Sequence, residues 1–129
     1  MRILYVEDTL LNLCLIERIA RMGNHEVINY VYAEQALENF ERDQPDLVLV
    51  DLRLEGEMSG VELIERLRAA GYTQPIIVIT AQAGDDVMER CQAAGCTEFY
   101  NKPLMVREMV RLLHRYAQDK PFDHFSSVG

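Results

Sequence analysis

Basic residues are scarce in this chain of 129 residues, which has 13 Lys and Arg against 21 Asp and Glu. The formal net charge is -8 and the sequence pI is about 4.8. This acidic balance argues against direct binding of nucleic acid, because such binding needs a basic face.

Long apolar runs are also missing. No run approaches the roughly 18 residues that indicate a transmembrane helix. The apolar stretch at residues 2–6 is too short for a signal peptide, and acids follow it directly. We therefore expect a cytoplasmic protein with no membrane insertion.

Cysteine is rare as well. Cys14, Cys91 and Cys96 are odd in number and contain no C-x-x-C pair. This pattern argues against a disulfide framework and against a zinc site, so we expect reduced thiols.

The chain does contain short apolar runs, at residues 2–6, 47–50 and 75–79, and a shorter segment at 97–100 that we also expect to form a strand. Runs without polar alternation are typical of strands buried on both faces of a parallel sheet that lies beneath helices. Segments with helical character alternate with them, at about residues 10–22, 34–42, 61–70, 85–94 and 104–117. The length suits a single domain of this alternating type.

Three acids stand at strand ends: Glu7 and Asp8 after the first strand, and Asp51 after the run at 47–50. The carboxyl ends of parallel strands form one edge, where ligands bind in open α/β sheets, so we expect these side chains to gather there. Two carboxylates about 4 Å apart repel each other by roughly 4 kcal/mol at an effective dielectric constant of about 20. A hard divalent cation would relieve this repulsion. We therefore predict a Mg²⁺ site, which Mn²⁺ could also occupy.

Two more polar side chains follow other strands, in the pairs Thr80-Ala81 and Lys102-Pro103. Together with the acids, a hydroxyl and an ammonium group at separate strand ends suit the transfer of a phosphoryl group to an aspartate. Asp51 would be the nucleophile, because a carboxylate can take a phosphoryl group as an acyl phosphate. Asp8 and Asp51 would hold the metal, while Thr80 and Lys102 donate hydrogen bonds to phosphoryl oxygens.

At these positions the chain resembles the receiver domain of two-component response regulators, over about residues 2–117. The resemblance implies that Asp51 is the phosphoacceptor. It also implies that Asp8 and the backbone carbonyl of Arg53 bind the metal directly and that Glu7 binds it through water.

The resemblance further implies that Thr80, Lys102 and the backbone of Ala81 bind the phosphoryl group. A cis peptide bond is expected between Lys102 and Pro103. Phe99, three residues before the lysine, matches an aromatic position that turns inward when Thr80 moves. Thr80 and Phe99 would thus form the switch.

The positions two residues after the acceptor and two after the threonine are Arg53 and Gln82. In receivers these positions flank the path of the water that attacks the acyl phosphate, so we expect both side chains to tune its lifetime. The segment 53–60 departs from the family, because it lacks a proline common there and looks one residue longer. This departure affects the shape of the loop and leaves the chemistry intact.

Repeated βαβ units predict a parallel sheet with right-handed crossovers. We therefore expect a flavodoxin-like, doubly wound α/β fold of five βα units with strand order 2-1-3-4-5. In the last helix Val106, Met109, Val110, Leu113 and Tyr116 recur at helical spacing and are expected to face the core. The domain would span residues 1–117. Residues 118–129 would form a tail that is flexible or partly docked through Phe122 and Phe125.

Three other functions compete with the phosphoacceptor hypothesis. A flavin carrier of this fold would need a phosphate-cradling loop after the first strand, but residues 7–10 carry acids that repel phosphate. A Mg²⁺-dependent phosphatase would need a second acid two residues after Asp51, where Arg53 stands and cannot shuttle a proton. A degenerate receiver that binds partners without phosphorylation stays open as the alternative.

We predict a phosphoacceptor in a two-component phosphorelay, with a histidine kinase or a histidine phosphotransfer protein as the donor. It would switch its surface and remove its own phosphoryl group, without acting as an enzyme on other substrates. An unknown protein effector is expected to bind the face around residues 85–117. The sequence leaves open a homodimer, and it leaves open whether the domain acts alone or belongs to a larger protein.

Overall fold

A five-stranded parallel sheet forms the centre of the molecule, with strand order β2-β1-β3-β4-β5. The computed structural model describes residues 1–54 and 56–118. The strands are β1 (Arg2–Val6), β2 (Glu26–Tyr30), β3 (Leu47–Val50), β4 (Ile76–Thr80) and β5 (Glu98–Asn101). This topology confirms the predicted flavodoxin-like fold.

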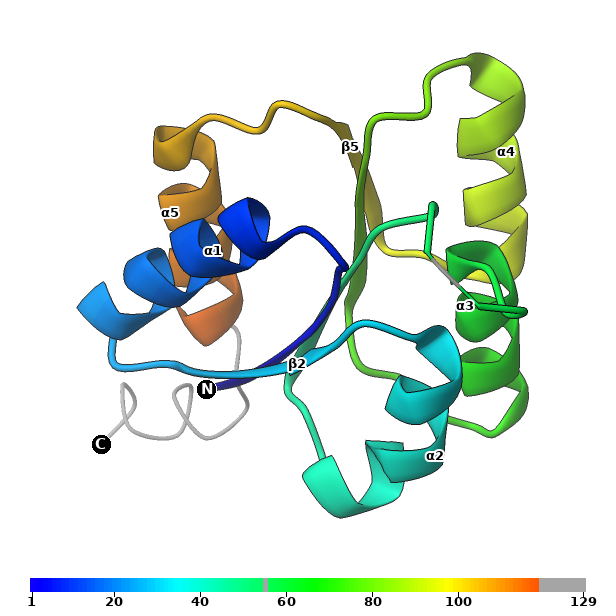
Figure 1. Cartoon of the computed structure of the whole chain (residues 1–129), viewed down its shortest axis with the longest axis horizontal. Coiled ribbons are helices and arrows are strands. Elements are labelled where there is room, and N and C mark those ends of the chain that lie inside the picture. Colours follow the sequence, from blue (N-terminus) through cyan, green and yellow to red (C-terminus); the bar gives the residue numbers. More distant parts are fainter. Residues whose placement is uncertain (55, 119–129) are drawn as a thin grey trace.

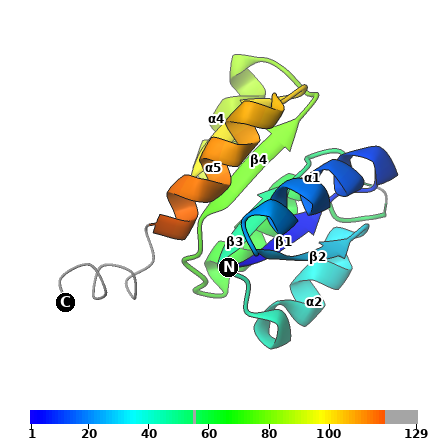
Figure 2. The same ribbon diagram turned by 90° about the vertical axis from the view of Figure 1, so that its left-hand side faces the viewer.

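Helices cover both faces of the sheet, as Figures 1 and 2 show. The helices α1 (Leu10–Met22) and α5 (Val106–Gln118) lie on one face, and α2 (Ala33–Asp43), α3 (Gly60–Ala69) and α4 (Asp85–Ala94) lie on the other. Side chains of β3 alternate between two cores: Val48 and Val50 pack towards α2, α3 and α4, whereas Leu47 and Leu49 pack towards α1 and α5. Burial on both faces explains why the strand sequences are apolar without alternation.

The predicted helix bounds lie within two residues of the observed ones. The expected core face of α5 is partly wrong. Val106 and Val110 are 51% and 40% exposed, whereas Leu112 is buried. The stripe that packs on the sheet consists of Met109, Leu112 and Leu113, because β4 and α1 approach α5 from that side. Apart from Gln118, the expected tail lies outside the described residues.

The structure also bears on the expected state of the cysteines and on the expected absence of a membrane-spanning helix. Cys14, Cys91 and Cys96 are free thiols, which agrees with the prediction. Among the helices of the described residues, none has the length and apolarity needed to cross a membrane.

Arg68 connects three segments by hydrogen bonds at the amino edge of the sheet. Its guanidinium donates hydrogen bonds to the carbonyl oxygens of Tyr72 at 2.9 Å, Gln74 at 2.8 Å and Gly95 at 2.9 Å. These contacts join the end of α3 to the turn before β4 and to the turn after α4. Burial lowers the pKa of Arg68, but the group stays charged, and planar multi-point donation of this kind suits arginine alone.

We predict that Arg68→Met lowers the free energy of unfolding by about 2–3 kcal/mol, because it leaves several half-buried carbonyl groups without a donor. Arg68→Lys should recover only part of the loss, since one ammonium group cannot reach all three carbonyls. Urea denaturation measures both effects. Arg66→Met, at an exposed position of the same helix, is the control, and an equal effect of the two methionine variants would contradict this role.

Candidate functional site

Lys102 joins two buried carboxylates at the carboxyl edge of the sheet. Its Nζ atom lies 2.8 Å from Glu7 Oε1 and 2.8 Å from Asp51 Oδ2. Glu7 is 1% exposed and Asp51 is 7% exposed. The structure therefore brings together three of the residues predicted from separate strand ends.

Backbone hydrogen bonds that continue the sheet place these residues. The N–H of Glu7 donates to the carbonyl of Tyr30 at 3.1 Å, the N–H of Asp51 donates to the carbonyl of Val6 at 3.1 Å, and the N–H of Lys102 donates to the carbonyl of Thr80 at 2.8 Å. Each functional residue is thus the first beyond a strand and still belongs to the hydrogen-bonding pattern of the sheet. Rigid elements of this kind suit precise positioning.

Gly60, the first residue of α3, lets that helix approach the acceptor closely. A Cβ atom at this position would lie 2.5 Å from the carbonyl oxygen of Asp51 and 2.8 Å from the Cα atom of Leu52. Both neighbours are backbone atoms and cannot easily move away. Only glycine therefore lets α3 begin directly against the backbone of the acceptor.

The two carboxylates differ in their electrostatics. Burial raises the pKa of Glu7, and the nearby Asp51 carboxylate adds to this rise, although Lys102 and Asn12 oppose it. Burial would also raise the pKa of Asp51, but hydrogen bonds from Lys102 Nζ and from the N–H of Arg53 hold it below its usual value. Burial would lower the pKa of Lys102, yet its bonds to both acids raise it. Asp51 therefore stays ionised, as a nucleophile must.

A buried acceptor atom on Glu7 makes this edge suitable for a hydrated Mg²⁺ ion. Oε2 of Glu7 is buried and has no hydrogen-bond partner among the described residues, so an acceptor is left for a water molecule of the ion's hydration shell. Asp8 lies exposed at the same edge, where Thr9 donates to its Oδ1 atom at 3.4 Å. Across residues 1–54 and 56–118, no group of three or more His, Cys, Asp or Glu side chains is arranged to hold an ion alone. Mg²⁺ needs fewer protein ligands than that, because it keeps several waters.

Thr80 is fully buried, and its hydroxyl accepts a hydrogen bond from the N–H of Gln82 at 3.2 Å. The amide of Asn101 donates to the carbonyl of Gln82 at 2.7 Å, so β5 holds the loop after β4. Ala81 is exposed in this loop. The hydroxyl of Thr80 is bonded within its own loop and not to Asp51.

The remaining predicted residues surround this centre. Arg53 is exposed, and its N–H donates to Asp51 Oδ1 at 3.2 Å. Phe99 is half-buried against the core that α2, α3 and α4 share with the sheet. The peptide bond between Lys102 and Pro103 is cis, as expected.

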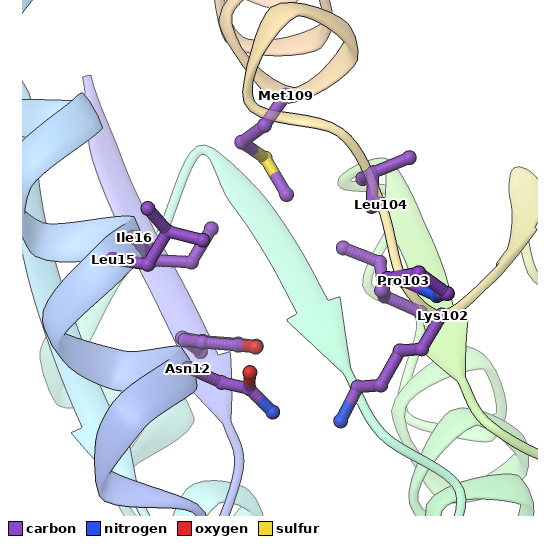
Figure 3. A pocket seen from close by; sticks show the side chains of 9 residues that line it. Asn12, Leu15, Ile16, Lys102, Pro103, Leu104 and Met109 are labelled. Carbon is purple, nitrogen blue, oxygen red and sulfur yellow. The ribbon is translucent and has the colours of Figure 1, made fainter.

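A cleft of about 180 Å³ opens beside Lys102, between α1 and the segment that leads into α5. Figure 3 shows Asn12, Leu15 and Ile16 of α1 on one side and Lys102, Pro103, Leu104 and Met109 on the other. Asn12 was not predicted from the sequence, and its amide donates to Glu7 Oε1 at 2.5 Å. Its position in the first turn of a helix that starts directly after the acid pair was the available signal.

Comparisons with known proteins agree with this geometry. The family model described as "Response regulator receiver domain" matches residues 3–114. The chain is 29% identical over 119 residues to the polar-differentiation response regulator DivK of Brucella anthropi. The alignment covers 91% of this chain and 96% of DivK. It is 30% identical over 118 residues to the sensory/regulatory protein RpfC of Xanthomonas campestris pv. campestris, covering 88% of this chain but spanning only 16% of RpfC.

Solved structures show the same likeness. The receiver domain of the sensor histidine kinase PA1611 from Pseudomonas aeruginosa PAO1, which has a magnesium ion in its active-site cleft, is 33% identical with a TM-score of 0.78, covering 89% of this chain and 95% of that one. The activated receiver domain of RstA from Klebsiella pneumoniae shares the fold with a TM-score of 0.83 at 24% identity, covering 92% of this chain and 100% of that one. With the family model matching most of its length, the chain belongs to the response regulator receiver domain family.

Proposed function

We propose that this receiver domain accepts a phosphoryl group on Asp51 from a phosphohistidine of a partner protein and later releases it as phosphate. The observation that carries this proposal is the state of Asp51: a carboxylate kept ionised by Lys102 Nζ on one oxygen and by the N–H of Arg53 on the other. The magnesium-containing PA1611 receiver and the response regulator DivK support the same chemistry.

In the proposed reaction an oxygen of Asp51 attacks phosphorus and an acyl phosphate bond forms. The bond between nitrogen and phosphorus breaks, and its electron pair returns to the imidazole of the donor, which regains a proton from solvent. Lys102 starts 2.8 Å from Asp51 and can shift onto a phosphoryl oxygen. Thr80 and the N–H of Ala81 supply further donors, and water later attacks phosphorus to restore the carboxylate.

Mg²⁺, held by Asp8, Asp51 and the carbonyl of Arg53 and by Glu7 through water, would neutralise charge on the phosphoryl group. Asp8 is already solvent-exposed, so it can receive a hydrated ion without first losing a buried contact.

An apolar surface beside the cleft supports a protein as the donor. Leu10, Leu11 and Leu15 of α1 are 73%, 76% and 39% exposed, and Leu15 also lines the cleft next to Lys102. Exposed leucines that gather beside a reaction centre favour a macromolecular partner. A histidine kinase or a histidine phosphotransfer protein fits this surface together with the chemistry of Asp51.

We further propose that α4, β5 and α5 bind the protein effector. Met88 of α4 is 37% exposed, and Tyr100 of β5 lines a cavity together with Arg111 and Arg115 of α5. Phe99 lies beneath this face and Thr80 lies on the neighbouring strand, so a change at the phosphoryl group can reach it.

With Mg²⁺ and acetyl phosphate, we predict that the protein gains one hydroxylamine-sensitive phosphoryl group and that Asp51→Asn abolishes this gain. The amide of asparagine cannot form a stable acyl phosphate. Intact-mass measurement decides the matter, with Asp86→Asn at an exposed position of α4 as the matched control. Labelling of Asp51→Asn equal to that of the control would contradict the assignment.

The lifetime of the phosphorylated state should depend on Arg53 and Gln82. Arg53 is exposed, and its guanidinium has no hydrogen bond or ion pair with the described residues, so it is free to shield the phosphoryl group. Gln82 lacks a carboxylate that would orient the attacking water. Arg53→Asn combined with Gln82→Glu should therefore shorten the half-life several-fold, since about 1.4 kcal/mol of barrier corresponds to a tenfold change in rate.

Decay of radiolabelled protein after removal of the donor measures this half-life. Binding of Mg²⁺ to the double variant should stay close to wild type, because Arg53 contributes its backbone carbonyl and not its side chain. A half-life equal to or longer than that of wild type would show that neither side chain limits hydrolysis.

Phosphorylation should also change the packing of Thr80 and Phe99. If Thr80 leaves the N–H of Gln82 for the phosphoryl group, space opens for Phe99 to rotate inward. Amide chemical shifts between the free and the beryllofluoride-bound protein should then change most in α4, β5 and α5. Phe99→Leu should reduce the changes in α4 and α5 while leaving those around Asp51. Wild-type changes confined to the loops around Asp51 would show that Phe99 serves only the core.

A further inference from the structure

Two donors share one oxygen of the buried Glu7 carboxylate. Lys102 Nζ lies 2.8 Å from Oε1, and the amide nitrogen of Asn12 lies 2.5 Å from the same atom. Oε2 has no partner among the residues that the structure describes. In Figure 3 the side chains of Asn12 and Lys102 point toward one another from opposite sides of the cleft.

This arrangement matters when Asp51 becomes phosphorylated. Lys102 forms ion pairs with both Glu7 and Asp51. To bind a phosphoryl oxygen on Asp51, it would have to turn away from Glu7. Without another donor, Glu7 would be left as a buried carboxylate that has lost its hydrogen bonds, which is costly. The amide of Asn12 can stay on Oε1 throughout, because its hydrogen bond goes to Glu7 and not to Asp51.

We propose that Asn12 is a positioning residue that holds Glu7 and so frees Lys102 for the phosphoryl group. The proposal rests on the phosphoacceptor function proposed above. An amide suits this task because it donates a hydrogen bond without bringing charge. A second cation at this place would oppose a metal ion, and a second carboxylate would repel Glu7.

The proposal predicts a split between two affinities. Mg²⁺ alone leaves Lys102 on Glu7, so its affinity should change little when Asn12 is replaced. Beryllofluoride with Mg²⁺ mimics the phosphoryl group on Asp51 and requires Lys102 to turn, so its affinity should fall. Because a hydrogen bond to a charged group is involved, we expect a loss of about tenfold or more.

The experiment compares wild type with Asn12→Leu, which has a similar volume and no donor. Titrations followed by NMR measure the affinity for Mg²⁺ alone and then for beryllofluoride at saturating Mg²⁺, with thermal unfolding as the check on folding. Asn12→Ala serves in its place should the leucine variant not fold. Asn39→Leu is the matched control, since within residues 1–54 and 56–118 Asn39 donates only to the carbonyl of Gln35 in its own helix, at 2.9 Å.

An Asn12 variant with weaker beryllofluoride binding, Mg²⁺ binding within about twofold of wild type and an unchanged control would support the role. Unchanged beryllofluoride binding would overturn it. An equal loss of both affinities would overturn it too, because Asn12 would then act on the whole site and not on the transfer of Lys102. A wild-type protein that binds no beryllofluoride would instead contradict the phosphoacceptor function itself.

Discussion

The site depends on the ion pairs that the ammonium group of Lys102 makes with two buried carboxylates. This group joins Glu7, 95 residues away in the chain, and Asp51, 51 residues away, through two ion pairs of 2.8 Å. Two carboxylates buried side by side without this cation would be strongly unfavourable. The ends of β1, β3 and β5 must therefore meet at one edge, which a parallel sheet with the order 2-1-3-4-5 provides.

Neutral amides hold the loops around this charged centre. Asn12 donates to Glu7, Asn29 donates to the carbonyls of Tyr5 and Glu7, and Asn101 donates to the carbonyl of Gln82. Each amide fixes one loop without adding to the charge at the edge. The charged groups of the site thus stay available for the metal and the phosphoryl group, while uncharged side chains supply the rigidity that positioning needs.

The fold and the residues at the strand ends could be predicted from the sequence, because a strand buried on both faces and the polar residue at its end are both local patterns. The fold, Asp51 and Lys102 belong to that class. The burial of α5 was only partly predicted: helical spacing suggested Val106 and Val110, but the approach of α1 and β4 decides which side packs. Asn12 was missed because its place in the first turn of α1 was a weak signal by itself, and its partner depends on how α1 leaves the end of β1.

The most direct test is the free energy of unfolding without Mg²⁺ of Lys102→Met, Glu7→Gln and the double variant. If Lys102 compensates the charge of the two buried acids, Lys102→Met should lower the free energy of unfolding by roughly 3 kcal/mol. This is the low end for a broken buried ion pair, because Glu7, whose pKa is raised by burial, can take up a proton. Adding Glu7→Gln should restore most of that loss, since one buried charge is gone. A Lys102→Met variant as stable as wild type, or a double variant no more stable than Lys102→Met, would contradict this role of the lysine.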